Sequence, residues 1–361
     1  MTITEAKHQT AWDDFLRRQR FSPFLQSWTM GEVYRDIGQV PVRLQAEENG
    51  VIVGICQGII VSARRGKHIA VPYGPVVSNS NAIGPLLDEL RHIARTEKCH
   101  FLRLSPFWPQ QSYEADRLIK ESGSRDAPLH LLGEHIWYLP LTDPDTWKSG
   151  TANDKRVSSD DLMASMRSTT RNLIRRAGKE GVTVSASNNP ASDLEHFLKL
   201  HELTRKRHGF TPYTDTFFRA QLQRFSERGE CSLYIARHQG EVLATSIHMR
   251  FGGETSYHHG ASLESKIPAS YLLQWTAIND AIKRDDHTYS FWGIAPVELN
   301  EEGKWRITHH GKNHPFAGVT LFKTGFGGSL LNLMHCRDIP LSPTYNLTRA
   351  IELMRKWKRG F

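Results

Sequence analysis

The sequence lacks a hydrophobic run long enough to cross a membrane as a helix. Its longest apolar run covers residues 51–63, well short of the roughly 20 residues that a spanning helix needs. Residues 1–14 include several charged side chains and no apolar stretch typical of a secretion signal. We therefore expect the protein to stay in the cytoplasm.

Cysteine is scarce, and its spacing excludes two kinds of site. Four cysteines lie far apart among the 361 residues, at positions 56, 99, 231 and 336. Because no two of them form a CxxC pair, the sequence predicts neither a disulfide framework nor a zinc site. We expect reduced, mostly buried thiols and no redox chemistry.

The composition is that of a folded protein with a positive net charge. Hydrophobic residues make up 39% and charged residues 23%, which excludes disorder, collagen and coiled coil as the main state. At about 100–200 residues per domain, the length predicts two domains. The net charge of +8 and the isoelectric point near 9.3 favour a polyanionic partner: nucleic acid, a nucleotide-linked substrate or anionic lipid.

The same succession of apolar runs and turns occurs twice in the sequence. Asn49-Gly50 in the first copy and Gln239-Gly240 in the second separate two strand-like runs, as in a β-hairpin. A third strand, a helix and a last strand follow each hairpin. The predicted segments are 40–45, 51–63, 68–71, helix 79–98 and 100–104, then 231–237, 242–250, 255–259, helix 269–284 and 288–292. We infer two α/β units with mixed sheets, the architecture of Gcn5-related acyltransferases, joined through the polar stretch 143–161.

A basic helix is predicted immediately after this boundary, at about residues 161–181. Apolar residues occupy one face of it, and cations cover the rest. Those we consider as anion-binding residues are Arg171, Arg175, Arg176 and Lys179. Two interpretations stay open here: a solvated face that keeps the protein soluble, or a surface for an anionic partner.

A second cluster of cations precedes a glycine with aromatic neighbours. Arg205, Lys206 and Arg207 come before Gly209, and Tyr213 follows. An arginine in such a position can bind phosphate with two hydrogen bonds. Cations at the C-terminus of a helix also interact favourably with the helix dipole, so this pattern has a structural explanation as well.

The segment 316–328 is a short apolar helix that ends in glycines and carries one lysine, Lys323. A lysine in apolar surroundings can stabilise a developing oxyanion or a phosphate, although lysines at helix ends also commonly extend to solvent. Neither GxGxxG nor GxxxxGK[ST] is intact in the glycine segment, so nucleotide hydrolysis is not predicted.

Histidine pairs suggest a metal, but their surroundings argue against it. His258-His259 and His309-His310 with His314 have no cysteine or carboxylate at a suitable spacing, and Gly311 interrupts the second group. We therefore predict no metal and no cofactor. The C-terminal helix is strongly basic and could contact nucleic acid or an anionic membrane surface; its cations are Arg349, Arg355, Lys356, Lys358 and Arg359, against Glu352.

Motifs along nearly the whole chain resemble the Fem-type (FemABX) aminoacyltransferases, which extend peptidoglycan stem peptides using aminoacyl-tRNA. No single motif is specific, but their order and spacing are. They are Phe24-Leu25-Gln26-Ser27, Pro72-x-Gly74-Pro75, Phe101-Leu102-Arg103, Arg171-Asn172-x-Ile174-Arg175, Thr204-x-x-Arg207, Tyr271-Leu272-Leu273-Gln274-Trp275, Tyr289-x-Phe291-x-Gly293 and Phe322-Lys323-x-Gly325-Phe326-Gly327.

This resemblance implies two Gcn5-related N-acetyltransferase-like domains in tandem, of the short form without a coiled-coil arm. The first would comprise residues 1–145 completed by 327–361, and the second residues 146–326. The implied partners are aminoacyl-tRNA and a nucleotide-linked or lipid-linked muropeptide. The basic C-terminal helix separately suggests peripheral contact with the inner membrane surface. The implied reaction is direct aminolysis of the aminoacyl ester, which needs no ATP and no covalent enzyme intermediate.

The resemblance also assigns site residues. Phe322 and Lys323 fall on the pair expected beside the tRNA terminus, with Lys323 countering negative charge. The implied precursor-binding residues are Tyr34 or Arg35, Tyr73, Arg207, Tyr213 and Tyr257. Ser290 and Ser105 stand where the family usually has acids, so no general base is predicted there.

Three alternatives remain open from the sequence. An acyl-coenzyme A acetyltransferase requires a pyrophosphate loop of the form [RQ]xxGx[GA], and the candidates near Arg175 and Arg237 both fail at the last position. A non-catalytic RNA-binding or membrane-binding protein would explain the charge but not the doubled unit. A tRNA-dependent transferase that uses a non-peptidoglycan amine is equally compatible with the motifs.

Overall fold

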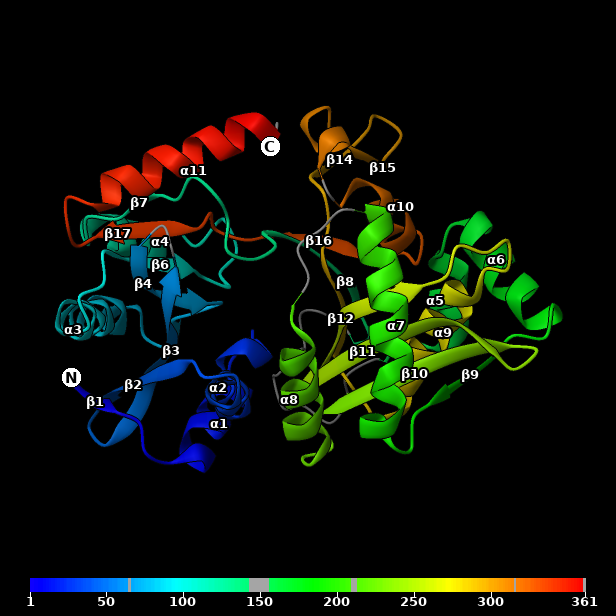
Figure 1. The fold of residues 1–361 in the computed structure, drawn as a ribbon, viewed down its shortest axis with the longest axis horizontal. Helices are drawn as coiled ribbons and strands as arrows, with labels where there is room; N and C mark the ends of the chain where they lie inside the picture. Colours follow the sequence, from blue (N-terminus) through cyan, green and yellow to red (C-terminus); the bar gives the residue numbers. More distant parts are fainter. Residues whose placement is uncertain (64–65, 143–155, 209–212, 315, 360–361) are drawn as a thin grey trace. The chain divides into compact units, whose positions relative to one another are not determined.

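Two β-sheets with helices packed against them organise the computed structural model (Figure 1). It describes residues 1–63, 66–142, 156–208, 213–314 and 316–359. The chain divides into two compact units, of which the first is Met1–Glu134 with Asn332–Phe361 and the second is His135–Leu331. The predicted α/β class with mixed sheets is confirmed.

The first unit contains an eight-stranded sheet with the order β1-β2-β3-β4-β6-β17-β7, in which β5 pairs with β3. Figure 1 shows that its last elements, drawn in red, come from the C-terminal end of the chain. The elements are β1 (Thr2–Glu5), α1 (Gln9–Arg17), α2 (Trp28–Asp36), β2 (Val40–Glu48), β3 (Val51–Ala63), β4 (Gly66–Pro72), β5 (Val76–Val77), α3 (Ile83–Thr96), β6 (Phe101–Ser105), α4 (Tyr113–Glu121), β7 (Arg125–Asp126), β17 (Arg337–Pro340) and α11 (Tyr345–Arg359).

The second unit contains a seven-stranded sheet with the order β16-β8-β13-β12-β11-β10-β9, and the separate hairpin β14-β15. Its elements are β8 (His135–Pro140), α5 (Ser159–Ser165), α6 (Ser168–Lys179), β9 (Thr183–Ala186), α7 (Pro190–His208), α8 (Asp215–Ser226), β10 (Cys231–His238), β11 (Glu241–Phe251), β12 (Glu254–Ser262), α9 (Ala269–Lys283), β13 (Thr288–Gly293), β14 (Val297–Leu299), β15 (Trp305–Ile307), α10 (Ala317–Thr324) and β16 (Ser329–Asn332).

The predicted doubling is visible in the strand pairing. In the first unit β2, β3 and β4 are antiparallel neighbours, and β6 then pairs parallel with β4 after α3. In the second, β10, β11 and β12 repeat this order, and β13 pairs parallel with β12 after α9. A parallel pair requires such a helical crossover, since a tight turn can join only antiparallel strands.

Both hairpins close with residues in the left-handed region. Asn49 and Gly50 have φ of 51° and 76°, and Gln239 and Gly240 have 49° and 83°. Two successive positive φ values define the two-residue turn whose twist matches that of the strands. The Asn-Gly turn signal therefore located the first hairpin correctly.

One helix in each unit supplies the core behind the sheet. Leu86, Leu87 and Leu90 of α3 are fully buried against residues of β2, β3 and β6. In the second unit Leu273 and Ala277 of α9 pack in the same way, in a core that also holds aromatic side chains. The four cysteines are buried and free, as predicted.

The unit boundaries differ from the expected domains 1–145 with 327–361 and 146–326. Residues of β8 pair with β13 in the second sheet, although the prediction gave them to the first domain. Likewise β16 lies beside β8 in the second sheet. Strand pairing at long sequence separation thus sets these limits, which a polar stretch in the sequence does not reveal.

The predicted helix 161–181 is two helices. Met166 and Arg167 have ψ of 154° and 139°, extended values that end α5 and precede α6. Among the described residues, no helix has both the length and the apolar composition that crossing a membrane requires.

Candidate active site

Lys323 lies in a short helix that is held in place by its neighbours. Arg167, just before α6, donates through Nη2 to the carbonyl oxygen of Leu321 at 2.7 Å and to Oγ1 of Thr324 at 2.6 Å. Thr320 Oγ1 in the same helix accepts a hydrogen bond from the backbone N–H of Ala295 at 2.8 Å. An eight-residue helix is marginal alone, so these contacts position α10.

The ammonium of Lys323 is buried in largely aromatic surroundings. The residue is 9% exposed, and Nζ donates to the carbonyl oxygen of Gly293 at 2.6 Å. Nζ also lies 5.8 Å from the ring centre of Tyr257 and 5.9 Å from that of Phe316, close enough for cation–π attraction. Burial lowers the pKa of Lys323 to about 7. The residue therefore exchanges its proton near neutral pH, a property common at catalytic sites.

A bulge in β13 supplies the carbonyl that Lys323 contacts. The register between β13 and β8 shifts between Ser290 and Gly293. Within this bulge Trp292 has a φ of 64°, an uncommon value for a bulky residue. Bulges often redirect groups beside active sites, and strained backbone at such a place is itself a functional indication.

Tyr257 lies between the lysine and a buried series of hydrogen-bonded polar side chains. Its ring stacks on His248 with centroids 5.5 Å apart. Nε2 of His248 lies 2.8 Å from the hydroxyl of Tyr289, which donates to Oε1 of Gln274 at 2.6 Å. Because that hydroxyl gives its proton to Gln274, Nε2 of His248 must be the donor to Tyr289. Burial lowers the pKa of His248 to about 3 and raises that of Tyr257 to about 12, so both side chains are neutral at pH 7.

Gly260 is required by the position of Tyr257. A Cβ atom at residue 260 would lie 1.8 Å from the Tyr257 hydroxyl oxygen. Any other residue there would displace the tyrosine ring. The close approach keeps Tyr257 beside Lys323.

Phe322, the other predicted catalytic residue, is half-buried in an aromatic cluster. Its ring makes edge contacts with Tyr271 at 4.9 Å and Phe326 at 5.3 Å. Phe326 in turn lies 5.2 Å from Phe291 of β13. This cluster is linked to the lysine through Tyr257, whose ring lies 6.4 Å from that of Phe291 and 5.8 Å from Nζ of Lys323. Apolar surroundings lower the local dielectric and strengthen the electrostatic effect of the lysine.

Arg207 and Tyr213 lie around the second half of β12. Arg207 is exposed at the end of α7, and its Nη2 donates to the carbonyl oxygen of Ser262 at 3.4 Å. Tyr213 is 48% exposed and stacks on Phe217 at 4.3 Å, with the ring of His259 at 5.5 Å. Both side chains are thus at least partly exposed to solvent. The rest of the motif, residues 209–212, lies outside the described residues.

The first-unit candidates differ in their access to solvent. Tyr34 is 7% exposed, whereas Arg35 is exposed and forms an ion pair with Glu32 at 2.8 Å. Tyr73 is fully buried, and its hydroxyl donates to the carbonyl oxygen of Gly133 at 2.9 Å. Such an enclosed, hydrogen-bonded side chain fits a structural role better than direct contact with a substrate.

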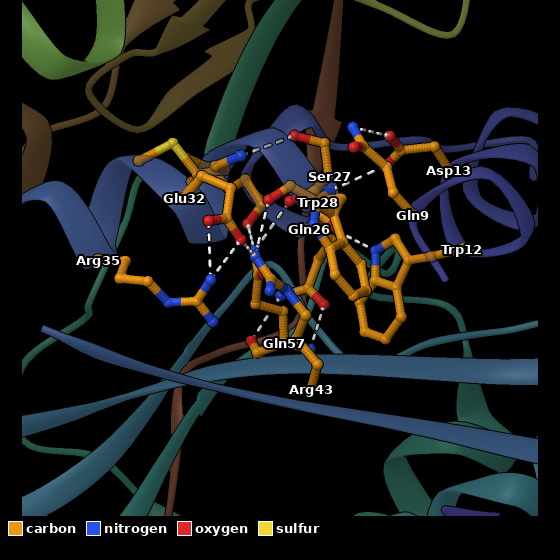
Figure 2. A network of polar contacts seen from close by, with 12 residues as sticks. Gln9, Trp12, Asp13, Gln26, Ser27, Trp28, Glu32, Arg35, Arg43 and Gln57 are labelled. Atoms are coloured by element: carbon orange, nitrogen blue, oxygen red, sulfur yellow. Dashed lines mark hydrogen bonds and ion pairs between the residues drawn. The ribbon is translucent and has the colours of Figure 1, made fainter. Parts of the chain in front are cut away.

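Sequence reasoning missed a buried polar network beside Arg35 (Figure 2). Arg43 donates to Glu32 at 2.8 Å and to Oε1 of Gln57 at 2.9 Å, and its guanidinium lies 3.9 Å from the ring centre of Trp28. The inward-facing arginine in an apolar strand was the available signal, since a buried charge requires partners. The network fixes α2, which carries Tyr34 and Arg35.

The basic residues of α6 separate into structural and available ones. Nη1 of Arg171 donates to the carbonyl oxygens of Ala164 at 2.9 Å and Met166 at 2.5 Å, so this side chain caps α5. Arg176 forms an ion pair with Glu180 at 2.8 Å. Arg175 and Lys179 are exposed and, among the described residues, have no ion-pair partner. These two are the cations most available for an anionic ligand.

The adjacent histidines do not form a metal site in the described part of the chain. The rings of His258 and His259 are 3.9 Å apart, and burial lowers the pKa of both. Among the described residues, no three His, Cys, Asp or Glu side chains are grouped to hold an ion.

The repeated unit of hairpin, strand, helix and parallel strand defines a tandem Gcn5-related N-acetyltransferase fold, here with a buried lysine beside the second sheet. The chain belongs to the FemAB family, whose family model matches residues 7–238 and 227–353. The resemblance read from the motifs is thereby confirmed.

Curated relatives and solved structures agree with this assignment. UDP-N-acetylmuramoylpentapeptide-lysine N(6)-alanyltransferase of Weissella viridescens is 25% identical over 294 residues, which cover 76% of this chain and 84% of that protein. Lipid II:glycine glycyltransferase of Staphylococcus aureus (strain MRSA252) is 25% identical over 248 residues, 66% of this chain and 54% of that longer relative. The crystal structure of FemX matches with a TM-score of 0.78 at 18% identity, covering 98% of this chain and all of FemX.

Proposed function

We propose that this chain is an aminoacyltransferase that adds one amino acid to the stem peptide of a peptidoglycan precursor. The observation that carries the proposal is Lys323, a buried lysine whose pKa burial lowers to about 7, in a chain of the FemAB family. The two curated relatives are named for alanyl and glycyl transfer to such precursors, and they support the reaction class.

The donor that we propose is aminoacyl-tRNA, because its ester is already activated. The acceptor amine attacks the ester carbonyl, the C–N bond forms, and the C–O bond to the ribose breaks as that oxygen takes up a proton. The acceptor must lose its proton first; an unperturbed lysine-type amine has a pKa near 10.4. The acceptor loses two protons in all: one goes to a substrate phosphate or to solvent before the attack, and the other goes to the leaving ribose oxygen as the amide forms. The protons therefore balance without a side-chain base.

Lys323 stabilises the negative charge that develops on the ester oxygen. In its largely aromatic surroundings, its ammonium acts with little screening by water. An approaching polyanion favours the charged form of the amine and therefore raises its pKa above the value of about 7 in the free protein. Phe322, the preceding residue in the chain, is proposed to contact the terminal nucleotide of the tRNA.

The anionic substrates would be held by the exposed cations. Arg207, with Tyr213 and Tyr257, is proposed to bind the diphosphate region of the precursor. In the first unit, Tyr34 and Arg35 are the proposed precursor-binding residues. Arg175 and Lys179, supported by Arg171 and Arg176, would bind the tRNA backbone. The reaction would take place in the cytoplasm, with any contact to the inner membrane being peripheral.

The acyl-coenzyme A alternative has little support in the loops. A pyrophosphate is commonly held by backbone N–H groups of a glycine-rich turn before a helix. Residues 263–268, which connect β12 to α9, contain no glycine, and the corresponding connection 73–82 contains only Gly74. A non-peptidoglycan amine as acceptor remains the second candidate, because the reaction chemistry is the same.

Incubation with mixed charged tRNAs and either UDP-linked or lipid-linked muropeptide tests the proposal. We expect mass spectrometry to show the addition of one amino acid residue to a stem peptide. Acetyl-coenzyme A in a parallel reaction tests the alternative donor. Acetylation with no aminoacyl product would overturn the assignment, and transfer only to an added small amine would favour the second candidate.

A further inference from the structure

The C-terminal helix α11 exposes an apolar face. At about 100° per residue, Leu347, Ala350, Met354 and Trp357 fall within a sector of about 80°, and Ile351 borders it. Leu347 is 68% exposed, Met354 58% and Trp357 82%, the last being the most exposed large hydrophobic side chain of the described residues. Large apolar side chains aligned in this way indicate an interaction surface.

The opposite side of α11 already anchors the helix to the first unit. Tyr345, Thr348 and Glu352 are buried. The Tyr345 hydroxyl donates to Asp338 of β17 at 3.0 Å, and the Glu352 carboxylate accepts from Arg103 of β6 at 2.6 Å. Figure 1 shows α11, in red, running along this unit. The exposed apolar face is therefore not needed to hold the helix in the fold.

The helix that carries this face has a positive net charge. The helix sequence carries five basic residues and one acidic residue, Glu352, and that carboxylate is occupied by its ion pair with Arg103. Arg355 and Lys356 are exposed, and neither has an ion-pair partner within the described part of the chain. The charge of Arg349, which donates to the carbonyl oxygen of Asp126 at 2.6 Å, is likewise not neutralised by that neutral group.

We propose that this face of α11 binds the surface of a bilayer that contains anionic phospholipid. An exposed tryptophan and aliphatic side chains on one side of a helix, with exposed cations on its other side, are the features of a helix that lies in the membrane interface. The apolar side chains enter the headgroup boundary while Arg355 and Lys356 reach the lipid phosphates. A purely protein partner would not require this surplus of cations, so charge complementarity selects the lipid surface.

Vesicle flotation with the full-length protein tests this proposal. We expect binding to phosphatidylcholine vesicles that contain phosphatidylglycerol, weak binding to phosphatidylcholine alone, and loss of binding at high salt. The double variant Met354→Gln/Trp357→Gln should lower the partition coefficient by about tenfold or more. The variant Arg355→Gln/Lys356→Gln should remove most of the preference for phosphatidylglycerol.

Tyr113→Gln is the matched control, because Tyr113 of α4 is 77% exposed but lies outside α11. All of these positions are exposed, so circular dichroism and thermal unfolding should match the unmodified protein. Equal binding to both kinds of vesicle, or an equal loss in the Tyr113 variant, would contradict the proposal. A dimer in sedimentation that Met354→Gln/Trp357→Gln dissolves would instead assign the face to a second copy of the chain.

A consequence for the substrate rests on the proposed function. If the acceptor is lipid-linked, Met354→Gln/Trp357→Gln should slow transfer to precursor in anionic vesicles while transfer to the UDP-linked precursor stays unchanged. Flotation does not depend on activity, so an inactive protein that binds vesicles refutes only the proposed function. An active protein that does not bind them refutes only the membrane surface.

Discussion

The Nζ atom of Lys323 donates a hydrogen bond to the carbonyl oxygen of Gly293, 30 residues earlier in the chain, at 2.6 Å. A carbonyl orients the ammonium but does not neutralise it, and within the described residues no carboxylate forms an ion pair with this lysine. Its charge is therefore held in place and left available for a substrate anion. The first three predictions below concern Lys323 and the helix that carries it, and the other two concern α6 and the first unit.

Replacing the lysine should affect catalysis much more than binding. We expect Lys323→Met to lower turnover on the order of 100-fold, since the charge acts on the developing oxyanion, with little change in precursor affinity. Steady-state kinetics and calorimetric titration measure the two effects. Lys283→Met, at a 74% exposed side chain of the same unit, should retain full activity; unchanged turnover in Lys323→Met would remove the lysine from the mechanism.

The same variant should change the pH dependence of stability. The unfolded chain keeps the lysine proton up to a pKa of 10.5, whereas the folded protein releases it near 7. Between these values the unfolded state binds more protons, so the free energy of unfolding rises with pH by roughly 1 kcal/mol per pH unit. Lys323→Met lacks this contribution. It should be the more stable protein at pH 7, by a margin that shrinks toward pH 10 in urea titrations; parallel curves for the two proteins would contradict the lowered pKa.

Arg167 should act as a positioning residue for α10. Arg167→Ala removes the hydrogen bonds to Leu321 and Thr324, so we expect turnover to fall about tenfold with the KM for precursor nearly unchanged. Arg167→Lys should restore part of the rate. Arg250→Ala is the control, because Arg250 makes comparable hydrogen bonds, to the carbonyl oxygens of Gly229 and Cys231 and to the hydroxyl of Ser232, without touching α10. An equal loss in both variants would indicate general destabilisation.

The exposed cations of α6 should govern tRNA affinity. Arg175→Glu/Lys179→Glu should weaken tRNA binding. The slope of the logarithm of the binding constant against the logarithm of the salt concentration should become less steep by about one to two. Arg117→Glu/Lys120→Glu reverses two exposed cations on α4 in the first unit and serves as the matched control. If filter binding detects the same affinity in both variants, the surface of α6 is only a solvated face.

Gln26 should be critical for the stability of the first unit. Its Nε2 donates to the carbonyl oxygens of Gln57 and Pro72 at 2.9 and 2.7 Å, and its Oε1 accepts from the Gln57 backbone N–H at 2.8 Å. Gln26→Ala leaves three buried backbone groups unpaired, so we expect a loss of about 2–4 kcal/mol in urea unfolding. The exposed Gln111→Ala should change stability little, and a similar small effect at Gln26 would mean that water replaces the amide.

Local signals predicted the elements well where turn chemistry and periodicity agree. Asn49-Gly50 and Gln239-Gly240 located both hairpins, because only a tight turn fits between two alternating runs. Helix 161–181 was predicted as continuous, since its apolar periodicity persists through Met166 while the backbone there is extended. What interrupts it are tertiary contacts, the Arg167 hydrogen bonds to α10.

In the candidate site, too, the sequence predicted some features and tertiary contacts decided others. The sequence singled out Lys323 as an isolated lysine among the apolar residues 316–328, and the resemblance to Fem-type enzymes gave it a site role. The structure adds that its ammonium is buried and does not extend to solvent. The basic residues of α6 all looked alike in sequence, yet Arg171 is occupied by backbone carbonyls and Arg175 is not. A residue's type states which bonds it can make, and the fold decides which of them are already made.

By itself the sequence determined the doubled α/β architecture, the positive charge and the lysine, since turns, periodicity and composition are local properties of the chain. Only the tertiary structure decided that β8 and β16 belong to the second sheet and that the bulged Gly293 carbonyl meets Lys323. It alone left the apolar face of α11 exposed. Such pairings join residues distant in the chain, and their free energy depends on burial and geometry that exist only once both sheets have formed.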